Sequence, residues 1–361
     1  GHFIYVAMIS RRHKELYIEY GSRGDGKAPN VIEDGEKREA LVTNTLYGAV
    51  YSSLERVKYW IKIIKEDNPA HLKQVRTIVC DKAVQYGNFQ VLKWAHEEGV
   101  PEEGFLWNSR TSLLATRNGH LDLLKYAHGN GCALHGDTCE EAARKGHLEV
   151  LKYAREQKFW WNGATCHGAA EKGHLDVLKW AHTNGCPWDA MTCRKAAKCG
   201  HLDILKWAHE NGCPWDENTC YCSANRGHLE VLKYAHANGC PWDTSTCYGA
   251  ARGGHLDVLK YAHENGCPWD EHTCVSAANG GHLEVLKYAH ENGCPWNSDI
   301  CYWPAYHGNL EILKYAHEHG CPWDFYTSQT AVLNGRLEVL KYAHENGCPL
   351  PQDDTIYARA A

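Results

Sequence analysis

Apolar and polar residues alternate along most of this 361-residue chain with the spacing of short amphipathic helices. In residues 202–211, Asp203, Lys206 and Glu210 fall at i, i+3 and i+7 and form one polar stripe. The remaining face carries Leu202, Ile204, Leu205, Ala208 and His209 and is wide enough to pack against neighbours on two sides. The pattern therefore predicts a buried-face helix over 202–211, which Gly212 ends in a left-handed conformation.

A bend and a second helical pattern follow. Pro214 stops the helix over 202–211, which is the second helix of its repeat, and Asp216 is placed to cap the first helix of the next repeat through its backbone N–H groups. That helix runs through Thr219 to Gly227, and its buried positions carry small residues, which permits close helix packing. Each element pair is thus two short helices joined by tight connections.

This pair of helices recurs every 27 residues. A repeat of this size cannot bury its own apolar face, so neighbouring repeats must stack into an all-α solenoid of helix-turn-helix units. We expect a non-periodic or degenerate segment at 1–44, two irregular repeats with loop insertions at 45–118, and a regular array at 119–361 that ends in a partial repeat. The repeated phrase Gly-His-Leu, altered in its last two copies, starts at Gly119, Gly146, Gly173, Gly200, Gly227, Gly254, Gly281, Gly308 and Gly335.

The repeat resembles the ankyrin repeat. Residues 250–259, Ala-Ala-Arg-Gly-Gly-His-Leu-Asp-Val-Leu, match the Ala-Ala-x-x-Gly-His phrase of that family and its apolar helix, and residues 266–270 fill the Gly-Ala-Asp-Val-Asn slot. The resemblance covers about residues 45 to 361. Ankyrin repeats have about 33 residues, so the β-hairpin finger is expected to be absent, and Thr-Cys replaces the Thr-Pro-Leu-His signature. The repeat sequence is similar to that of expanded ankyrin-type families in large DNA viruses and some protists. This similarity implies a non-enzymatic protein-interaction scaffold.

Charge and hydropathy narrow the choice of partner. The net charge of −6 disfavours a nucleic-acid surface, and no stretch reaches the roughly 18 apolar residues of a membrane span. We therefore expect a protein partner, neither nucleic acid nor membrane, and an intracellular, cytoplasmic location.

Cysteines and histidines recur at fixed positions of the repeat, and we call each such set a column. Their recurrence suggests disulfides or metal binding, but packing explains it as well. Of 18 cysteines, eight start the first helix of a repeat and eight follow the second helix. Disulfides between residues seven apart, such as Cys186 and Cys193, would leave orphans, and the His209/Cys213 spacing lacks two of the ligands that a zinc site needs. We expect reduced packing cysteines and neither cofactor nor metal, with a metal-binding His/Cys array as the weaker alternative. The other histidine column, with His201, His228 and His255, is expected to form hydrogen bonds between repeats.

Three further motifs resemble binding sites but are better explained by structural roles. The loop Gly21–Lys27 has the spacing of a phosphate-binding loop, but Ala28 replaces its Ser/Thr. The lysine column of the second helices has acids three residues earlier and is expected to pair with them. A column of tryptophans in the bends is expected to pack in the core. No catalytic constellation stands out from the repeats.

Function is expected where the repeats differ. Differences concentrate after Thr-Cys, after the capping Asp and before Gly-His, on the face that lines the concave side in the resembled family. Aromatic and Arg side chains there are typical of interface hot spots. The alternative is a structural subunit that self-associates end to end, suggested by the half-repeats at the chain ends. The predicted partner-binding residues are Arg194, Lys198, Tyr221, Arg226, Tyr248, Arg252, Tyr302, Trp303, Tyr306, Phe325 and Tyr326.

Overall fold

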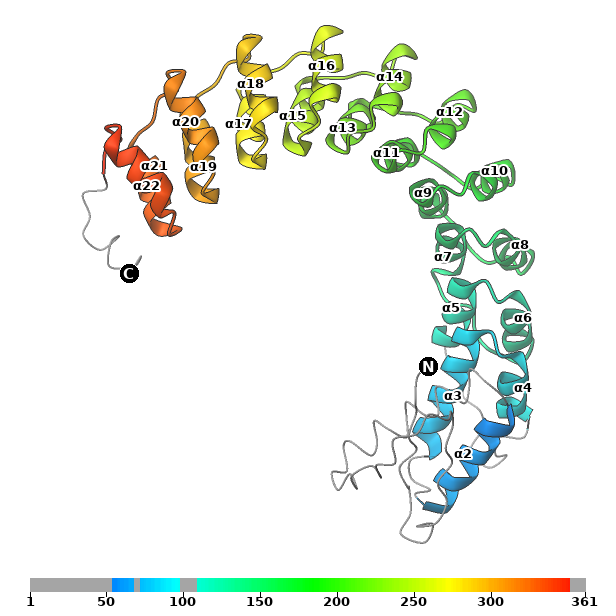
Figure 1. Cartoon of the computed structure of the whole chain (residues 1–361). Helices are drawn as coiled ribbons and strands as arrows, with labels where there is room; N and C mark the ends of the chain where they lie inside the picture. The colour runs from blue at the N-terminus through cyan, green and yellow to red at the C-terminus, as the bar shows by residue number, and fades with distance from the viewer. Residues whose placement is uncertain (1–53, 68–71, 98–108, 351–361) are drawn as a thin grey trace, which may run out of the picture. The chain divides into compact units, whose positions relative to one another are not determined.

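The computed structural model describes residues 54–67, 72–97 and 109–350, and every regular element within these ranges is an α-helix (Figure 1). The all-α prediction is therefore confirmed. The loop Gly21–Lys27 and the expected partial repeat at 355–361 lie outside the described residues. The chain divides into two compact segments, one up to Trp160 and one from Trp161 onward.

The N-terminal segment contains seven described helices, and the C-terminal segment contains fourteen. In each full repeat a first helix pairs with the second helix that follows it. The N-terminal helices are α2 (Leu54–Asp67), α3 (Leu72–Tyr86), α4 (Phe89–Glu97), α5 (Ser109–Asn118), α6 (Leu121–Gly129), α7 (Thr138–Lys145) and α8 (Leu148–Glu156). The C-terminal helices are α9 (Gly163–Lys172), α10 (Leu175–Thr183), α11 (Ala190–Cys199), α12 (Leu202–Glu210), α13 (Glu217–Asn225), α14 (Leu229–Ala237), α15 (Thr244–Gly253), α16 (Leu256–Glu264), α17 (Glu271–Gly280), α18 (Leu283–Glu291), α19 (Asp299–His307), α20 (Leu310–Glu318), α21 (Phe325–Leu333) and α22 (Leu337–Glu345).

The first helices begin and end where the sequence predicts. At the start of α11, the Asp189 carboxylate accepts a hydrogen bond from the backbone N of Met191 at 2.9 Å, which satisfies a donor that the helix itself leaves open. Asp216 forms a capping box with Thr219 at the start of α13. At the other end of α11, Gly200 has φ +77° and its backbone N–H reaches the last carbonyls of the helix.

The core is a continuous row of small and branched apolar side chains. In α12, Ile204, Leu205 and Ala208 are fully buried, and in α11, Ala196 and Ala197 are fully buried. Because the first helices carry these small residues, α11 packs directly against both α9 and α13. The row formed by residues 161–350 has two layers and curves toward its first helices (Figure 1).

Histidines join one repeat to the next, as the sequence predicts. His228 Nε2 lies 3.2 Å from the Lys198 carbonyl oxygen, and His282 Nε2 lies 3.2 Å from that of Arg252. The histidine ring covers the glycine of the preceding repeat so closely that a Cβ on Gly254 would lie 2.5 Å from His282 Nδ1. In the altered last repeat, Arg336 replaces histidine and its Nε donates to the Tyr306 carbonyl at 3.0 Å.

Candidate partner-binding surface

The predicted partner-binding residues lie on the first helices of the C-terminal segment, and none of them is buried. Six are exposed: Lys198, Arg226, Arg252, Tyr306, Phe325 and Tyr326. The remaining five are half-buried: Arg194, Tyr221, Tyr248, Tyr302 and Trp303. The structure therefore places the non-repeating side chains where a partner can reach them.

Aromatic side chains gather on α19 and α21, which pack against each other. Trp303 contacts the rings of Tyr302 and Tyr306 in edge-on arrangements, with centroids 5.2 and 6.0 Å apart. The rings of Phe325 and Tyr326 lie 4.0 Å apart at the start of α21. Tyr306 is 41% exposed and Tyr326 is 54% exposed, so both leave considerable apolar area in water.

The sequence interpretation missed Leu333, which is 51% exposed at the end of α21. It occupies the position two residues before the repeat glycine, as Tyr306 does in the preceding repeat. A leucine in a helical pattern is normally assigned to the core. In the sequence, only the repeat position that it shares with Tyr306 indicates that it faces solvent.

The basic residues of the surface differ in how they are held. Arg194 binds the Asp216 carboxylate with both its Nε, at 2.9 Å, and its terminal nitrogen. This bidentate pair lowers the pKa of Asp216, chiefly through the hydrogen bonds from Arg194. Because Asp216 also caps α13, Arg194 is part of the framework that positions that helix. Arg252 donates to the Tyr248 hydroxyl at 2.8 Å.

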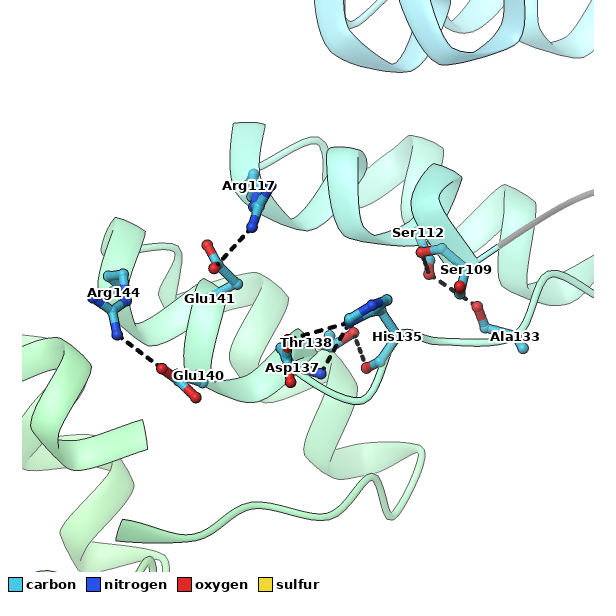
Figure 2. Close-up of polar contacts among 10 residues, drawn as sticks. All are labelled: Ser109, Ser112, Arg117, Ala133, His135, Asp137, Thr138, Glu140, Glu141 and Arg144. Carbon is cyan, nitrogen blue, oxygen red and sulfur yellow. Dashed lines mark hydrogen bonds and ion pairs between the residues drawn. The ribbon is translucent and has the colours of Figure 1, made fainter. Parts of the chain in front are cut away.

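The corresponding cations in the N-terminal segment are neutralised. Figure 2 shows Arg117 on α5 reaching Glu141 on α7 at 3.1 Å, and Arg144 reaching Glu140 at 2.8 Å. Arg117 and Arg144 hold the same repeat position as Lys198 and Arg252. No carboxylate within the described ranges forms an ion pair with Lys198, Arg226 or Arg252.

In the layer formed by the second helices, the aromatic side chains pack against other side chains of the repeats. His209 at the end of α12 stacks on Trp215 of the following bend, with ring centroids 3.7 Å apart, and its edge meets Tyr234 of the next repeat. The sequence predicted only helix-end interactions for this histidine column, because the stacking partner lies beyond a bend. The same stack recurs at His182, His236, His263, His290 and His317 with the tryptophans six residues later. The tryptophan column thus packs against protein rather than forming an open platform.

The lysine column makes two kinds of contact. Where Glu precedes by three residues, as at Lys152 and Lys233, an ion pair of 2.7 to 2.8 Å forms, as predicted. Where the shorter Asp precedes, as at Lys206 and Lys260, the ammonium lies over the tyrosine of the next repeat, 5.4 to 5.5 Å from the ring centroid. The second-helix layer is therefore cross-linked between repeats by cations and rings.

Cysteines that lie 20 residues apart come together within one pair of helices. Cys166 on α9 interacts with Cys186, which follows α10. The cysteines of the described ranges are free thiols. The interaction with the partner thiol and burial raise the pKa of one thiol in each pair, namely Cys166, Cys193, Cys240, Cys247, Cys274 and Cys301. The six pairs are 166/186, 193/213, 220/240, 247/267, 274/294 and 301/321.

The described residues contain neither a metal-ligand set nor a membrane-spanning helix. Across residues 54–67, 72–97 and 109–350, no group of three or more His, Cys, Asp or Glu side chains is arranged to hold a metal ion. Among the helices within these ranges, none combines the length and apolar character needed to cross a membrane.

Paired helices, a glycine and histidine at each junction and a variable first-helix layer define an α-solenoid built from helix-turn-helix repeats. Residues 166–209 match the family model described as ankyrin repeats (many copies), and the matched phrase recurs at 27-residue intervals on both sides. Residues 166–209 therefore consist of ankyrin repeats, and ankyrin repeats generally act as protein–protein interaction modules.

Two further comparisons complete the picture. The crystal structure of the human ASB11 ankyrin repeat domain is similar over 44% of this chain and 84% of its own, with 20% identity and a TM-score of 0.38. No curated protein sequence matches the chain.

Proposed function

We propose that this protein is a non-enzymatic scaffold that binds a protein partner along the concave first-helix layer of its C-terminal segment. The observation that carries the proposal is the exposure of aromatic side chains on α19 and α21. Tyr306, Phe325 and Tyr326 are 40 to 54% exposed in a protein whose other aromatic columns are stacked against neighbouring repeats. An aromatic cluster without a framework partner is typical of an interface centre.

The chemistry of the layer supports binding rather than catalysis. Tyr, Trp and Arg dominate the non-repeating positions, and these side chains supply large contact areas at low entropic cost. Caps such as Asp189 and histidine bridges such as that of His228 hold the first helices beneath them.

The proposal is tested by replacing Tyr302, Tyr306 and Tyr326 together with Ala in the full chain. Pull-down from native lysate followed by mass spectrometry is expected to lose the captured partner, since about 2 kcal/mol or more per hot-spot side chain is typical. The thermal midpoint should change little, because these side chains contribute little to the core.

A matched triple variant on the other layer serves as the control. Glu210, Glu264 and Glu291 are exposed at the ends of α12, α16 and α18, and their replacement by Ala should leave capture intact. Equal capture by wild type and the tyrosine variant would refute the proposed surface. Light scattering of the same samples checks the rival structural role, which requires self-association.

A further inference from the structure

Unpaired positive charge lies on one part of the proposed surface. Lys198, Arg226 and Arg252 are exposed at the C-terminal ends of the consecutive first helices α11, α13 and α15. Lys198 and Arg252 stand two residues before the repeat glycine, whereas Arg226 stands one residue before it, directly after α13. In the N-terminal segment, Arg144 and Arg117, also two residues before the repeat glycine, are bound by Glu140 and Glu141 (Figure 2). A cation near the helix end also favours the helix dipole, but that role does not require the absence of an acidic partner.

Exposed apolar surface lies farther along the same row of helix ends. Tyr306 ends α19 and Leu333 ends α21, both at the position that Lys198 and Arg252 hold in their repeats. They are 41% and 51% exposed. Between the two groups, α17 presents the uncharged Asn279 at this position. The row therefore changes from basic to neutral to apolar along one edge of the layer.

Resting on the proposed function, we infer that the partner is an extended acidic peptide segment. Its carboxylates bind Lys198, Arg226 and Arg252, and an aromatic or aliphatic side chain farther along the same segment packs on Tyr306 and Leu333. Carboxylates match guanidinium groups in both charge and geometry. A nucleic acid would match the cations but leave the apolar end of the row uncovered, so the two-part surface favours a peptide.

The fold sets the spacing of the peptide groups. Adjacent packed helices lie about 8–10 Å apart, and an extended chain advances about 3.3 Å per residue, so the carboxylates should recur about every third residue. From α15 to α19 there are two such steps, which places the apolar anchor about five or six residues beyond the last carboxylate.

The experiment is selection of random 16-residue peptides displayed on phage against the full-length chain. The enriched peptides are synthesised with a fluorescent label, and their affinities are measured by anisotropy. The expected result is enrichment of peptides with Asp or Glu at about three-residue spacing, followed by an aromatic or aliphatic residue about six positions away. Raising the salt concentration should weaken binding, because exposed charge contacts are screened.

Three variants assign the binding to residues. Replacing Lys198, Arg226 and Arg252 together with Gln should reduce affinity about tenfold or more, as should Tyr306→Ala with Leu333→Ser; a tenfold change corresponds to about 1.4 kcal/mol. The matched control, Arg117→Gln with Arg144→Gln, neutralises the same repeat position where the cations are already paired, and should change affinity less than about twofold by the same measure. Circular dichroism and thermal unfolding verify that each variant is folded.

Several results would overturn the inference. They are enrichment of peptides without acidic residues, failure to enrich any peptide, wild-type affinity in the Gln triple variant, or displacement of the peptide by a single-stranded oligonucleotide at equal concentration. The lysate capture described above is an independent measurement. If capture depends on the tyrosines while the selected peptides lack acids, the surface is right and the partner chemistry is wrong.

Discussion

At the residue scale, the cysteine thiols that follow the second helices are hydrogen-bond donors as well as apolar fillers. Cys267 Sγ lies 3.3 Å from the carbonyl oxygen of Asp243, the residue that caps α15. Where serine replaces the first-helix cysteine, Ser112 donates from Oγ to the Ala133 carbonyl at 2.9 Å. The alanine usual at one of these positions in the resembled family could fill the space but could not make these bonds.

We predict that thiol reactivity will separate two cysteines from the rest. Cys199 and Cys222 are half-buried, whereas the other sixteen are buried. Burial raises the pKa of Cys222, so less of it is thiolate at neutral pH and its modification should accelerate as the pH rises toward 9. Titration with a chromogenic disulfide reagent should find about two reactive thiols in the native chain and the full set in denaturant.

The double variant Cys199→Ser with Cys222→Ser is the control, and it should abolish the fast phase. A fast phase that persists in this variant would contradict the assignment, since it would mean that the paired cysteines open readily to solvent.

The cysteine columns are evident from the sequence, but their pairing is not. Cys186 and Cys193 are seven residues apart and flank one bend, which makes them natural candidates. The packing of α11 on α12 instead sets Cys193 against Cys213. Periodicity gives the positions that repeat, whereas the contact depends on how the two helices of a pair pack on each other, which no residue spacing specifies.

At the scale of the element, α7 begins differently from the other first helices. His135 stands where Asp189 stands two repeats later, and its Nδ1 accepts a hydrogen bond from the Asp137 backbone N at 3.1 Å (Figure 2). The imidazole nitrogen thus occupies the place of the carboxylate oxygen that accepts from Met191. Thr138 adds a hydrogen bond from its hydroxyl to the His135 carbonyl at 2.7 Å.

We predict that His135→Asp stabilises the chain by about 0.5–1 kcal/mol, because Asp is a better N-cap and its charge favours the positive end of the helix dipole. His135→Ala should destabilise it by a similar amount, since the Asp137 N–H would lose its acceptor. Urea unfolding followed by circular dichroism measures both. Equal stability of the three proteins would show that the histidine does not act as a cap.

Helix positions were largely predictable because each signal is local. The predicted helix over 202–211 is observed as Leu202–Glu210, Gly212 follows it with φ +81°, and the expected cap Asp216 begins α13. Longer-range contacts were not predictable from the repeat pattern. The stack of His209 on Trp215 and the position of Lys206 over Tyr234 require the next bend and the next repeat to be in place.

At the scale of the whole molecule, stability depends on the junctions between repeats, because each repeat contacts only its neighbours. Two glycines adopt positive φ in most repeats of the described ranges, but only one of them lies at a junction. Gly254 has φ +77° and is covered by the His282 ring of the next repeat. Gly266 has φ +83°, and a Cβ added to it would meet no other atom within 4 Å.

This difference permits a matched test of how cooperatively the C-terminal segment unfolds. Gly266→Ala should introduce only the strain of a left-handed alanine, about 1 kcal/mol. Gly254→Ala should introduce the same strain and also displace His282 from its hydrogen bond with Arg252. A nearest-neighbour array weakened at one junction should separate into two cooperative units on either side of it.

We therefore expect Gly254→Ala to broaden the urea transition and lower its m-value, while Gly266→Ala shifts the midpoint with an unchanged m-value. Hydrogen exchange can locate the boundary, because protection should fall on both sides of α15 and α16 before it falls elsewhere in the segment. If both variants shift the transition equally and leave its slope unchanged, the histidine–glycine junction does not carry the coupling between repeats. The cohesion of the row would then have to come from the apolar contacts of Val258 and Leu259, which both variants retain.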